Sequence, residues 1–195
     1  DFSLQPFRYK MIRSLDFYQS MNNKLAEFDQ LTRIKASVSF IEDGWVTTEV
    51  QSFQSSKVFS SIYNPKSLYQ QKKYPVLLQH FVGQVVQTHK PCFDPDKIEF
   101  MNFNVPQKGN TRFMYVLPID KNIALFEFTL FSKDLLEHSE YEEAIKDYLK
   151  EKKVTDYEIL EKENGAIPMT SFKFEELNSN SILNIGTAGG WTKAS

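Results

Sequence analysis

The spacing of hydrophobic and polar positions changes several times along the chain, and each change predicts a different element. Residues 14–29 begin at Ser14, a residue type that caps helices, and carry apolar side chains at mostly helical spacing, which predicts a helix. Residues 34–50 alternate between apolar and polar side chains around an Asp-Gly pair, which predicts a hairpin. A third strand at residues 56–64 is expected to complete a meander.

From residue 76 the apolar runs are longer, and turn-rich joins such as PQKGNT and IDKN separate them. These runs predict a large antiparallel sheet with one strongly apolar face; they are residues 76–90, 97–106, 112–119 and 122–132. Residues 139–152 combine capping-box spacing, an apolar face and terminal lysines, which predicts a helix. A strand at 156–164, a segment GAIPM and an apolar strand at 182–185 follow.

Composition describes an ordinary globular chain and excludes several classes of function. Its 195 residues, 41% of them hydrophobic, can bury a sizeable core in one large domain or in two lobes that share a sheet. The net charge of -2 gives no general attraction to nucleic acid, so no nucleic-acid partner is expected. Cys92 is the single cysteine, which excludes an intramolecular disulfide and fits a reducing compartment.

The two ends of the sequence are unusual for a complete chain. The first residues, DFSLQPFRYK, match neither a signal peptide nor a common chain start, and GGWTKAS stops in what reads as the beginning of a helix. We therefore expect a piece of a longer protein. No apolar run approaches the ~20 residues that a bilayer-spanning helix needs.

One acidic residue, Glu127, interrupts the apolar run 122–132. On a strand its face is shared by apolar or small neighbours: Leu125, Thr129 and Phe131. Because desolvation raises the pKa of a carboxyl, such a group can remain protonated near neutrality and act as a general acid. The alternatives are an ion pair across the sheet, with Arg112 on the preceding strand as the partner, or a solvent-facing edge.

A glycine-rich segment, GTAGG, directly follows the apolar strand 182–185. At such a turn the backbone N–H groups can approach an anion or a flavin edge closely, and the dipole of a helix starting there would assist. The same pattern is typical of a tight strand-to-helix turn without a ligand. The fingerprint G-x-G-x-x-G is absent from the chain, so the sequence does not contain a complete dinucleotide site.

Other candidate chemistry is weaker. The histidines lie apart without metal-ligand spacing, so no metal is expected; they are His80, His89 and His138. No serine sits in a nucleophile elbow, so a hydrolase triad has no anchor. A basic cluster in the loop before residue 76 could touch a membrane surface, and a solvated loop is the alternative; its members are Lys66, Lys72 and Lys73.

Several segments, in order, resemble a FAD-dependent lycopene cyclase of the bacterial type related to the plant enzymes. They are FRYKMIRSLDFY, LLQHFVGQVVQT with FDPD after it, NFNVPQKGNTRFMYVLPI, NIALFEFTLFSKDLL, EYEEAIKDYL, GAIPMT and NIGTAGGWTKAS. The resemblance spans nearly all of the chain. The succession of TRFMYVLP, ALFEFTLFS and IGTAGG-x-TK is far more specific than any one motif.

The resemblance implies an α+β fragment of an α/β FAD-binding flavoprotein, with an antiparallel substrate-domain sheet, flanking helices, a meander and a strand returning to the FAD domain. It assigns 1–65 to part of the FAD-binding domain, 66–170 to the substrate-binding domain, and 171–195 to the return. Because the N-terminal fingerprint is missing, only the second flavin contact is expected here. Its residues are Gly186, Thr187, Ala188, Gly189 and Gly190.

The chemistry that the resemblance implies has no net redox change. The terminal double bond of an acyclic carotenoid is protonated, the carbocation closes on a neighbouring double bond, and proton loss gives an ionone ring, with reduced FAD stabilising the cation. In the plant relatives the motif F-L-E-E-T carries the essential acid, and residues 125–129 match it with Glu127 at the first acidic position. Glu127 is thus the candidate acid/base. The candidate substrate-binding residues are Phe126, Phe128, Phe131 and Arg112.

The same resemblance implies a hydrophobic polyene substrate and a cytoplasmic protein peripheral to the inner membrane. Three departures from the family pattern could mean a divergent substrate or a weakened flavin site. Phe59 to Ile62 replace F-D-S-R, Asn102 replaces an aspartate, and Trp191 follows the GG where methionine is expected. Two other functions stay open: a flavin-dependent reductase or monooxygenase of isoprenoids or aromatics, and a non-catalytic module that binds hydrophobic ligands.

Overall fold

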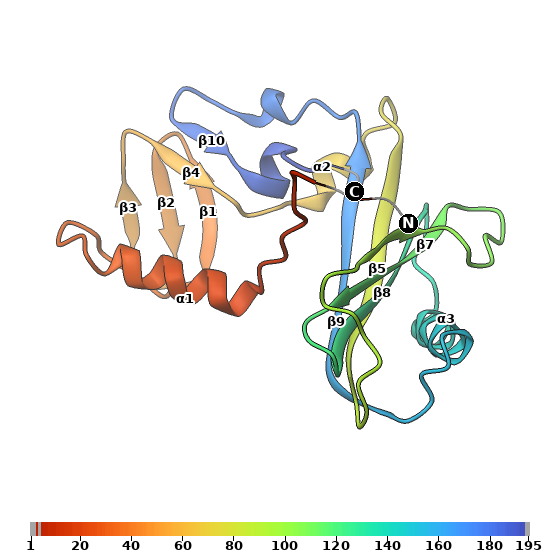
Figure 1. The fold of residues 1–195 in the computed structure, drawn as a ribbon. Coiled ribbons are helices and arrows are strands. Elements are labelled where there is room, and N and C mark those ends of the chain that lie inside the picture. The colour runs from red at the N-terminus through yellow and green to blue at the C-terminus, as the bar shows by residue number, and fades with distance from the viewer. Residues whose placement is uncertain (1–2, 4, 194–195) are drawn as a thin grey trace. The chain divides into compact units, whose positions relative to one another are not determined.

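The computed structural model describes residue 3 and residues 5–193, which fall into two compact units (Figure 1). The first unit contains the chain up to residue 41 together with 46–53, and the second contains 42–45 and the chain from residue 54 onward. The predicted division at residues 65 and 170 differs from this one and stays a prediction. No helix in the described residues is long and apolar enough to cross a membrane.

The first unit combines one helix with a meander. Helix α1 (Ser14–Leu25) is preceded by Arg13 at the cap position, and none of its residues is buried. Strands β1 (Val38–Glu42), β2 (Trp45–Thr48) and β3 (Ser52–Gln54) form a sheet in that order. The predicted hairpin is confirmed, with Asp43 and Gly44 both at positive φ in its turn.

The predicted third strand of the meander is wrong. The Thr48 hydroxyl donates to the Gln51 carbonyl (2.8 Å) and accepts from the Val50 N–H (3.2 Å), which closes a tight turn directly after β2. Residues 52–54 therefore complete the meander. The apolar run that follows, β4 (Val58–Ser60), instead pairs in parallel with the returning strand β10 (Ile182–Asn184).

The loop expected before residue 76 contains a short helix, α2 (Pro65–Gln70). The Asn64 side chain accepts from the Lys66 N–H (3.0 Å), and Pro65 occupies the first turn, where its missing N–H costs nothing. Lys66 therefore belongs to a capped helix, which the turn-forming residues around it concealed.

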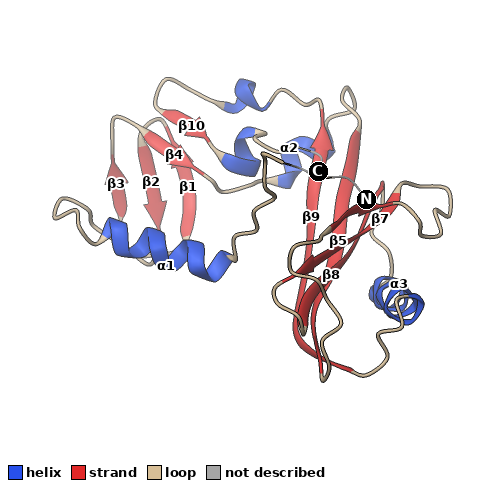
Figure 2. Cartoon of the chain, viewed as in Figure 1, coloured by secondary structure: helices blue, strands red, loops and turns tan. Residues whose placement is uncertain are grey.

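The large antiparallel sheet is confirmed, and all of its strand pairs run antiparallel (Figure 2). Its spatial order is β6-β7-β8-β5-β9. Its strands are β5 (Val76–Thr88), β6 (Glu99–Asn102), β7 (Arg112–Pro118), β8 (Ile123–Ser132) and β9 (Tyr157–Thr170). The predicted strand 156–164 and GAIPM form one continuous strand, β9, at the edge beside β5.

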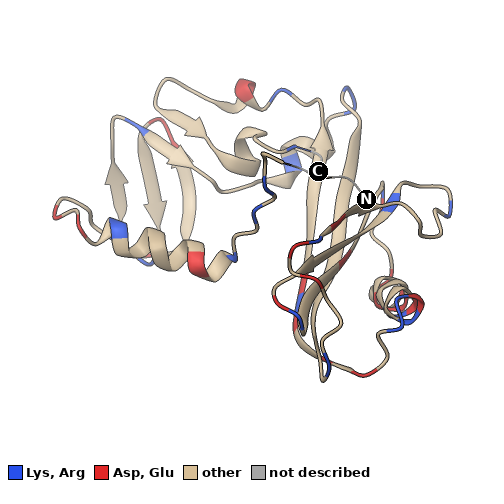
Figure 3. Cartoon of the chain, in the orientation of Figure 1, with Lys and Arg blue, Asp and Glu red and all other residues tan. Residues whose placement is uncertain are grey.

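Helix α3 (His138–Glu151) covers one face of this sheet, and it carries both acidic and basic residues (Figure 3). Alternate sheet residues point toward it because side chains alternate across a strand. This side, the helix face, forms the core with Tyr141, Ile145, Tyr148 and Leu149. Fully burying each such apolar side chain stabilises the fold by about 1.5–3 kcal/mol.

Candidate functional site

The candidate site lies on the other side of the same sheet, which we call the distal face. One cross-strand row crosses it: Tyr115 on β7, Glu127 on β8, Gly83 on β5 and Glu163 on β9 are aligned in register. Residues aligned in this way share a face. Glu127 therefore has a phenol ring on one side and a glycine on the other.

Glu127 is partly buried and accepts one hydrogen bond, from the Thr129 hydroxyl to its Oε1 (2.7 Å). Burial raises the pKa of Glu127, the Thr129 hydrogen bond acts in the opposite direction, and the negative charge of Glu163 raises the pKa further. Among the described residues no basic side chain forms an ion pair with it. A carboxyl in these surroundings is suited to hold a proton rather than a charge.

Arg112 does not pair with Glu127, because the two side chains lie on opposite faces. Arg112 is in register with Leu130 on the helix face, and its Nη1 donates to Glu140 of α3 (2.9 Å). Its Nε donates to Asn110 (2.6 Å). Arg112 thus ties the sheet to α3, away from the row that holds Glu127.

The predicted phenylalanines are divided between the faces. Phe126 and Phe128 are core residues of the helix face, at 1% and 2% exposure, and their rings pack edge-on against Tyr148 and Tyr141. Phe131 lies on the distal face beside Phe113, with ring centroids 6.1 Å apart. The structure therefore brings only Phe131 of these three to the face of Glu127.

Aromatic side chains from neighbouring strands, which sequence reasoning missed, cover much of the distal face. Phe113 and Tyr115 of β7 stand edge to face at 5.4 Å and are almost fully buried. Phe103 and Phe100 pack over them at 5.4 and 5.3 Å and are each 50% exposed. The alternation within RFMYVLP was the signal, since it places both β7 aromatics on one face.

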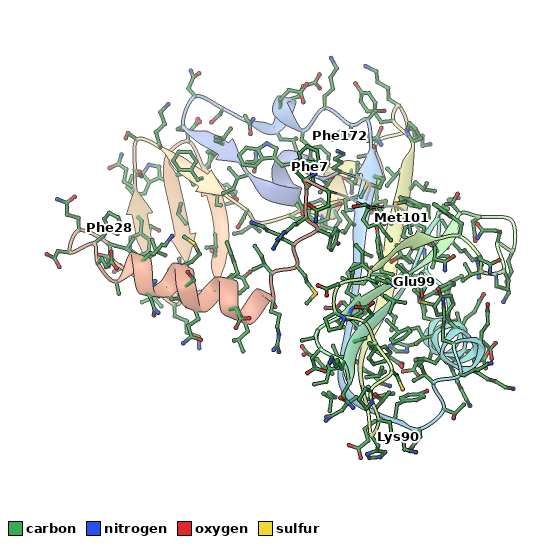
Figure 4. All side chains as sticks on the ribbon, in the orientation of Figure 1. Phe7, Phe28, Lys90, Glu99, Met101 and Phe172 are labelled. Carbon is green, nitrogen blue, oxygen red and sulfur yellow. The ribbon has the colours of Figure 1, made fainter. Side chains whose placement is uncertain are left out.

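A bulge in β6 orients the rings of Phe100 and Phe103 toward the distal face. Glu99 pairs with Val116 and Asn102 with Met114, so β6 has one residue more than β7 between these pairs. Met101 is the extra residue, and its φ is 48°. Figure 4 labels both Met101 and Glu99. The bulge turns Glu99 and Asn102 toward the helix face, where both bond Tyr148. Asn102, a departure from the family pattern, thus serves the attachment of α3.

Two glycines on the distal face leave room that neighbours fill. A Cβ at Gly165 would come within 2.7 Å of the Phe81 ring, and a Cβ at Gly83 within 2.8 Å of Glu163 Cγ and Oε1. The Phe81 ring therefore lies over Gly165, and the Glu163 carboxyl lies over Gly83.

The glycine-rich segment forms one 3-10 turn, η2 (Gly186–Gly189), directly after β10. The residues described after it are not helical, so the predicted helix start is a single turn within the described chain. A Cβ at Gly189 would meet the Asn184 carbonyl oxygen at 2.3 Å, and one at Gly190, where φ is 73°, would meet Phe174 at 2.5 Å. These two glycines are required by the turn itself.

Gly186 is different, because its φ is 59° and a Cβ there would meet nothing within 4 Å. Its backbone faces open space, which suits the close approach of a ligand, and the first N–H groups of such a turn have no partner inside it. The flavin contact expected at this turn stays a prediction. The segment after it meets the sheet at Pro168, whose carbonyl accepts from Thr192 (3.4 Å). Pro168 lies roughly 17 Å along β9 from Glu163.

The described residues gather no group of three or more side chains that could ligate a metal. A half-covered antiparallel sheet, a meander and a returning strand that ends in a glycine turn make up an α+β fold. The family model described as lycopene cyclase protein matches residues 2–195, and the chain belongs to that family.

One solved structure with a similar fold is a triple mutant of the flavin-dependent brominase Bmp2, with a TM-score of 0.56 and 12% identity. The match covers 91% of this chain and 50% of that one, so the chain spans half the length of the structure it matches. A comparison with curated proteins finds no match. The predicted α+β fold and the predicted family are confirmed.

Proposed function

We propose that the protein containing this chain is a carotenoid cyclase, which closes the end group of an acyclic polyene by acid catalysis without net redox change. The observation that carries the proposal is Glu127: a desolvated carboxyl without a basic partner among the described residues, on a sheet face lined by aromatic rings. Membership of the lycopene cyclase family supports the choice of substrate class.

In this proposal Glu127 protonates a terminal double bond. A carbon base is a weak proton acceptor, so the donor must be a carboxylic acid rather than a hydrated carboxylate. The Thr129 hydroxyl fixes Oε1 of Glu127 and leaves Oε2 for the substrate. The exposed aromatic faces of Phe100 and Phe103, which pack over Tyr115 and Phe113, can stabilise the cation that follows.

The flavin in this proposal is held at Gly186 and the turn that follows it, together with the part of a FAD-binding domain that the family implies. A bound reduced flavin supplies an electron-rich ring system that favours a nearby cation. FAD as the particular flavin, and its reduced state, are parts of the proposal.

The polyene substrate also places the protein at a membrane surface, because such molecules reside in the bilayer. We propose a peripheral, cytoplasmic position at the inner membrane. A vesicle flotation assay with anionic lipid tests this part, and failure of the intact protein to float would contradict it.

The decisive experiment is carotenoid product analysis in lycopene-accumulating cells that express the intact protein, comparing the wild type with Glu127→Gln. We expect ringed carotene from the wild type and a loss of at least ~100-fold in the variant. Glu143→Gln, at an exposed position on α3, is the matched control and should retain activity. Full activity of Glu127→Gln, with both proteins folded, would contradict the assigned role.

A second candidate is a flavin-dependent reductase or monooxygenase of isoprenoids or aromatics. The fold shared with a flavin-dependent brominase favours it as an alternative, as does the departure at residues 59–62 from the family pattern. Reduced or hydroxylated products without rings in the same analysis would select this candidate. Binding of lycopene without any turnover would select a ligand-binding module instead.

A further inference from the structure

We propose that Glu163 on β9 is a positioning residue for Glu127: the two carboxyls lie on either side of Gly83, and the negative charge of Glu163 keeps Glu127 in its acidic form. This electrostatic coupling stands on the geometry of the sheet. Its catalytic consequence rests on the proposed cyclase function.

The register of three strands brings the two carboxyls together. Gly83 of β5 is aligned with Glu127 on one side and with Glu163 on the other. Neighbouring strands lie about 4.8 Å apart, so a side chain at position 83 would normally separate the two acids. Gly83 has none, and the space above it is occupied by the Glu163 side chain.

The position of Glu163 shows in the contacts that a Cβ at Gly83 would make. It would lie 2.8 Å from Glu163 Cγ, 2.8 Å from Glu163 Oε1 and 3.1 Å from Leu125 Cδ1. The Glu163 side chain therefore leans inward from the sheet edge, toward β8. Its carboxyl lies about one strand spacing from the position of Glu127.

The charged and titratable groups around Glu127 are few. Tyr115 faces Glu127 from β7, and Gly83 on β5 has no titratable side chain. On β9 the titratable groups are Glu163 in the same row and Glu161 in the next row. Glu163 is solvent-exposed and Glu127 is only partly exposed, so a negative charge on Glu163 disfavours ionisation of Glu127. In agreement, burial and Glu161 raise the pKa of Glu163, and burial and Glu163 raise that of Glu127.

The two carboxyls also close the proton balance of the proposed reaction. The Glu127 O–H bond breaks as the proton adds to the terminal alkene carbon, and a second alkene then forms the ring C–C bond to the cation. A ring C–H bond breaks next, its electron pair becomes the new double bond, and the proton passes to the carboxylate pair. One proton leaves the pair and one returns, so no oxidant or reductant is consumed.

Carboxyl titration tests the electrostatic coupling without any need for activity. In the intact protein labelled with ¹³C at glutamate carboxyls, the Glu127 resonance is followed from pH 4 to pH 9. We expect Glu163→Gln to move its midpoint to lower pH, because the neighbouring charge is gone. Glu158→Gln, an exposed residue of the same strand, should leave it unchanged. An unchanged midpoint in Glu163→Gln would overturn the proposal.

Gly83→Ala tests the geometry with both charges retained. Its φ is outside the left-handed region, and the nearest atoms that the added methyl would displace belong to the side chains of Glu163 and Leu125. We expect the same direction of change in the Glu127 midpoint as for Glu163→Gln. A folded Gly83→Ala protein with the wild-type midpoint would overturn the placement of Glu163 over Gly83.

The pH profile of ring formation tests the catalytic consequence. An acid of lowered pKa is lost at lower pH, so the alkaline limb of Glu163→Gln should move to lower pH. We expect about tenfold less activity than wild type on that limb and near-equal activity at the acid end. An unmoved limb would overturn the positioning role. Coupled titration without ring formation by the wild type would support the coupling of the two carboxyls and overturn the cyclase function.

Discussion

At the scale of single residues, the face of the strand on which a side chain lies decides which charged groups it can contact. The pattern of NIALFEFTLFS correctly predicts that Glu127 leaves the apolar face of its strand, since Phe126 and Phe128 on either side are buried beneath α3. It could not predict the partner of Arg112, because the sequence does not give the register between strands. The structure aligns Arg112 with Leu130 and sends its guanidinium to Glu140.

His80 gives a second residue whose environment decides its proton. It is 1% exposed, with Nδ1 at 2.6 Å from the Tyr141 hydroxyl and Nε2 at 2.7 Å from Ser132 Oγ. Burial lowers the pKa of His80, and the charge of Arg112 lowers it further. The folded protein therefore holds a neutral imidazole between two hydroxyl groups.

This arrangement predicts a loss of stability on mild acidification. The unfolded chain binds a proton at His80 near its ordinary pKa of about 6.5, whereas the folded chain does so only at lower pH. The free energy of unfolding should therefore fall as the pH drops below about 6.5 and on toward the folded pKa. Urea denaturation at pH 7.5 and 5.5 measures it, and His80→Gln should show a smaller difference between the two.

The control for this prediction is His89→Gln, because the His89 side chain is 63% exposed. It should keep the full pH dependence of the wild type. Equal pH dependence in the wild type and in His80→Gln would contradict the buried neutral imidazole.

At the scale of elements, α3 is attached to the sheet by a polar cluster as well as by the core. Asn102 Nδ2 donates to Glu99 (2.8 Å) and to the Tyr148 hydroxyl (2.6 Å), and Lys152 Nζ lies 2.6 Å from Glu99. Burial acts to raise the pKa of Glu99, but the hydrogen bonds from Lys152, Tyr148 and Asn102 outweigh it and lower the pKa. Glu99 is therefore an anion that needs donors around it.

Asn102→Asp should accordingly destabilise this protein. It removes two donated hydrogen bonds and places a carboxylate beside Glu99, at a cost of about 1–3 kcal/mol at neutral pH. The cost should shrink at acid pH, where one carboxyl is protonated. Thermal unfolding at pH 7 and pH 4.5 measures it. Asn104→Asp adds the same charge at an exposed position and should be nearly neutral.

The elements themselves were largely predictable, and their partners were not. Periodicity within 76–132 and 139–152 gave the long strands and α3, because each carries a clear period over many residues. The short run β4 has no such length, and its pairing with β10 joins segments more than a hundred residues apart. The bulge at Met101 turns Phe100 and Phe103 to the distal face. The spacing of apolar residues in the sequence does not predict such a bulge.

At the scale of the whole molecule, the glycine turn is where the returning chain ends its strand and meets the rest of its unit. Gly190 packs against Phe174, and the Ile185 N–H that precedes the turn donates to the Ser60 carbonyl (2.9 Å) on β4. The sequence predicted a turn here but left its purpose open, since a tight turn and a flavin contact need the same glycines. The contacts that an added Cβ would make distinguish these two roles. A Cβ at Gly189 or Gly190 would clash, so these glycines are needed for the turn, whereas a Cβ at Gly186 would meet nothing within 4 Å.

Gly190→Ala tests whether this turn supports flavin binding. The added methyl meets the Phe174 ring at 2.5 Å in a left-handed residue, so the turn must shift and carry Gly186 with it. We expect the intact protein to retain at least tenfold less flavin, measured by absorbance after gel filtration. Gly109→Ala is the matched control, because Gly109 is also left-handed (φ 83°) but its Cβ would meet nothing within 4 Å. Equal flavin content in both variants would contradict a role of this turn in flavin binding and would leave the turn with a structural role only.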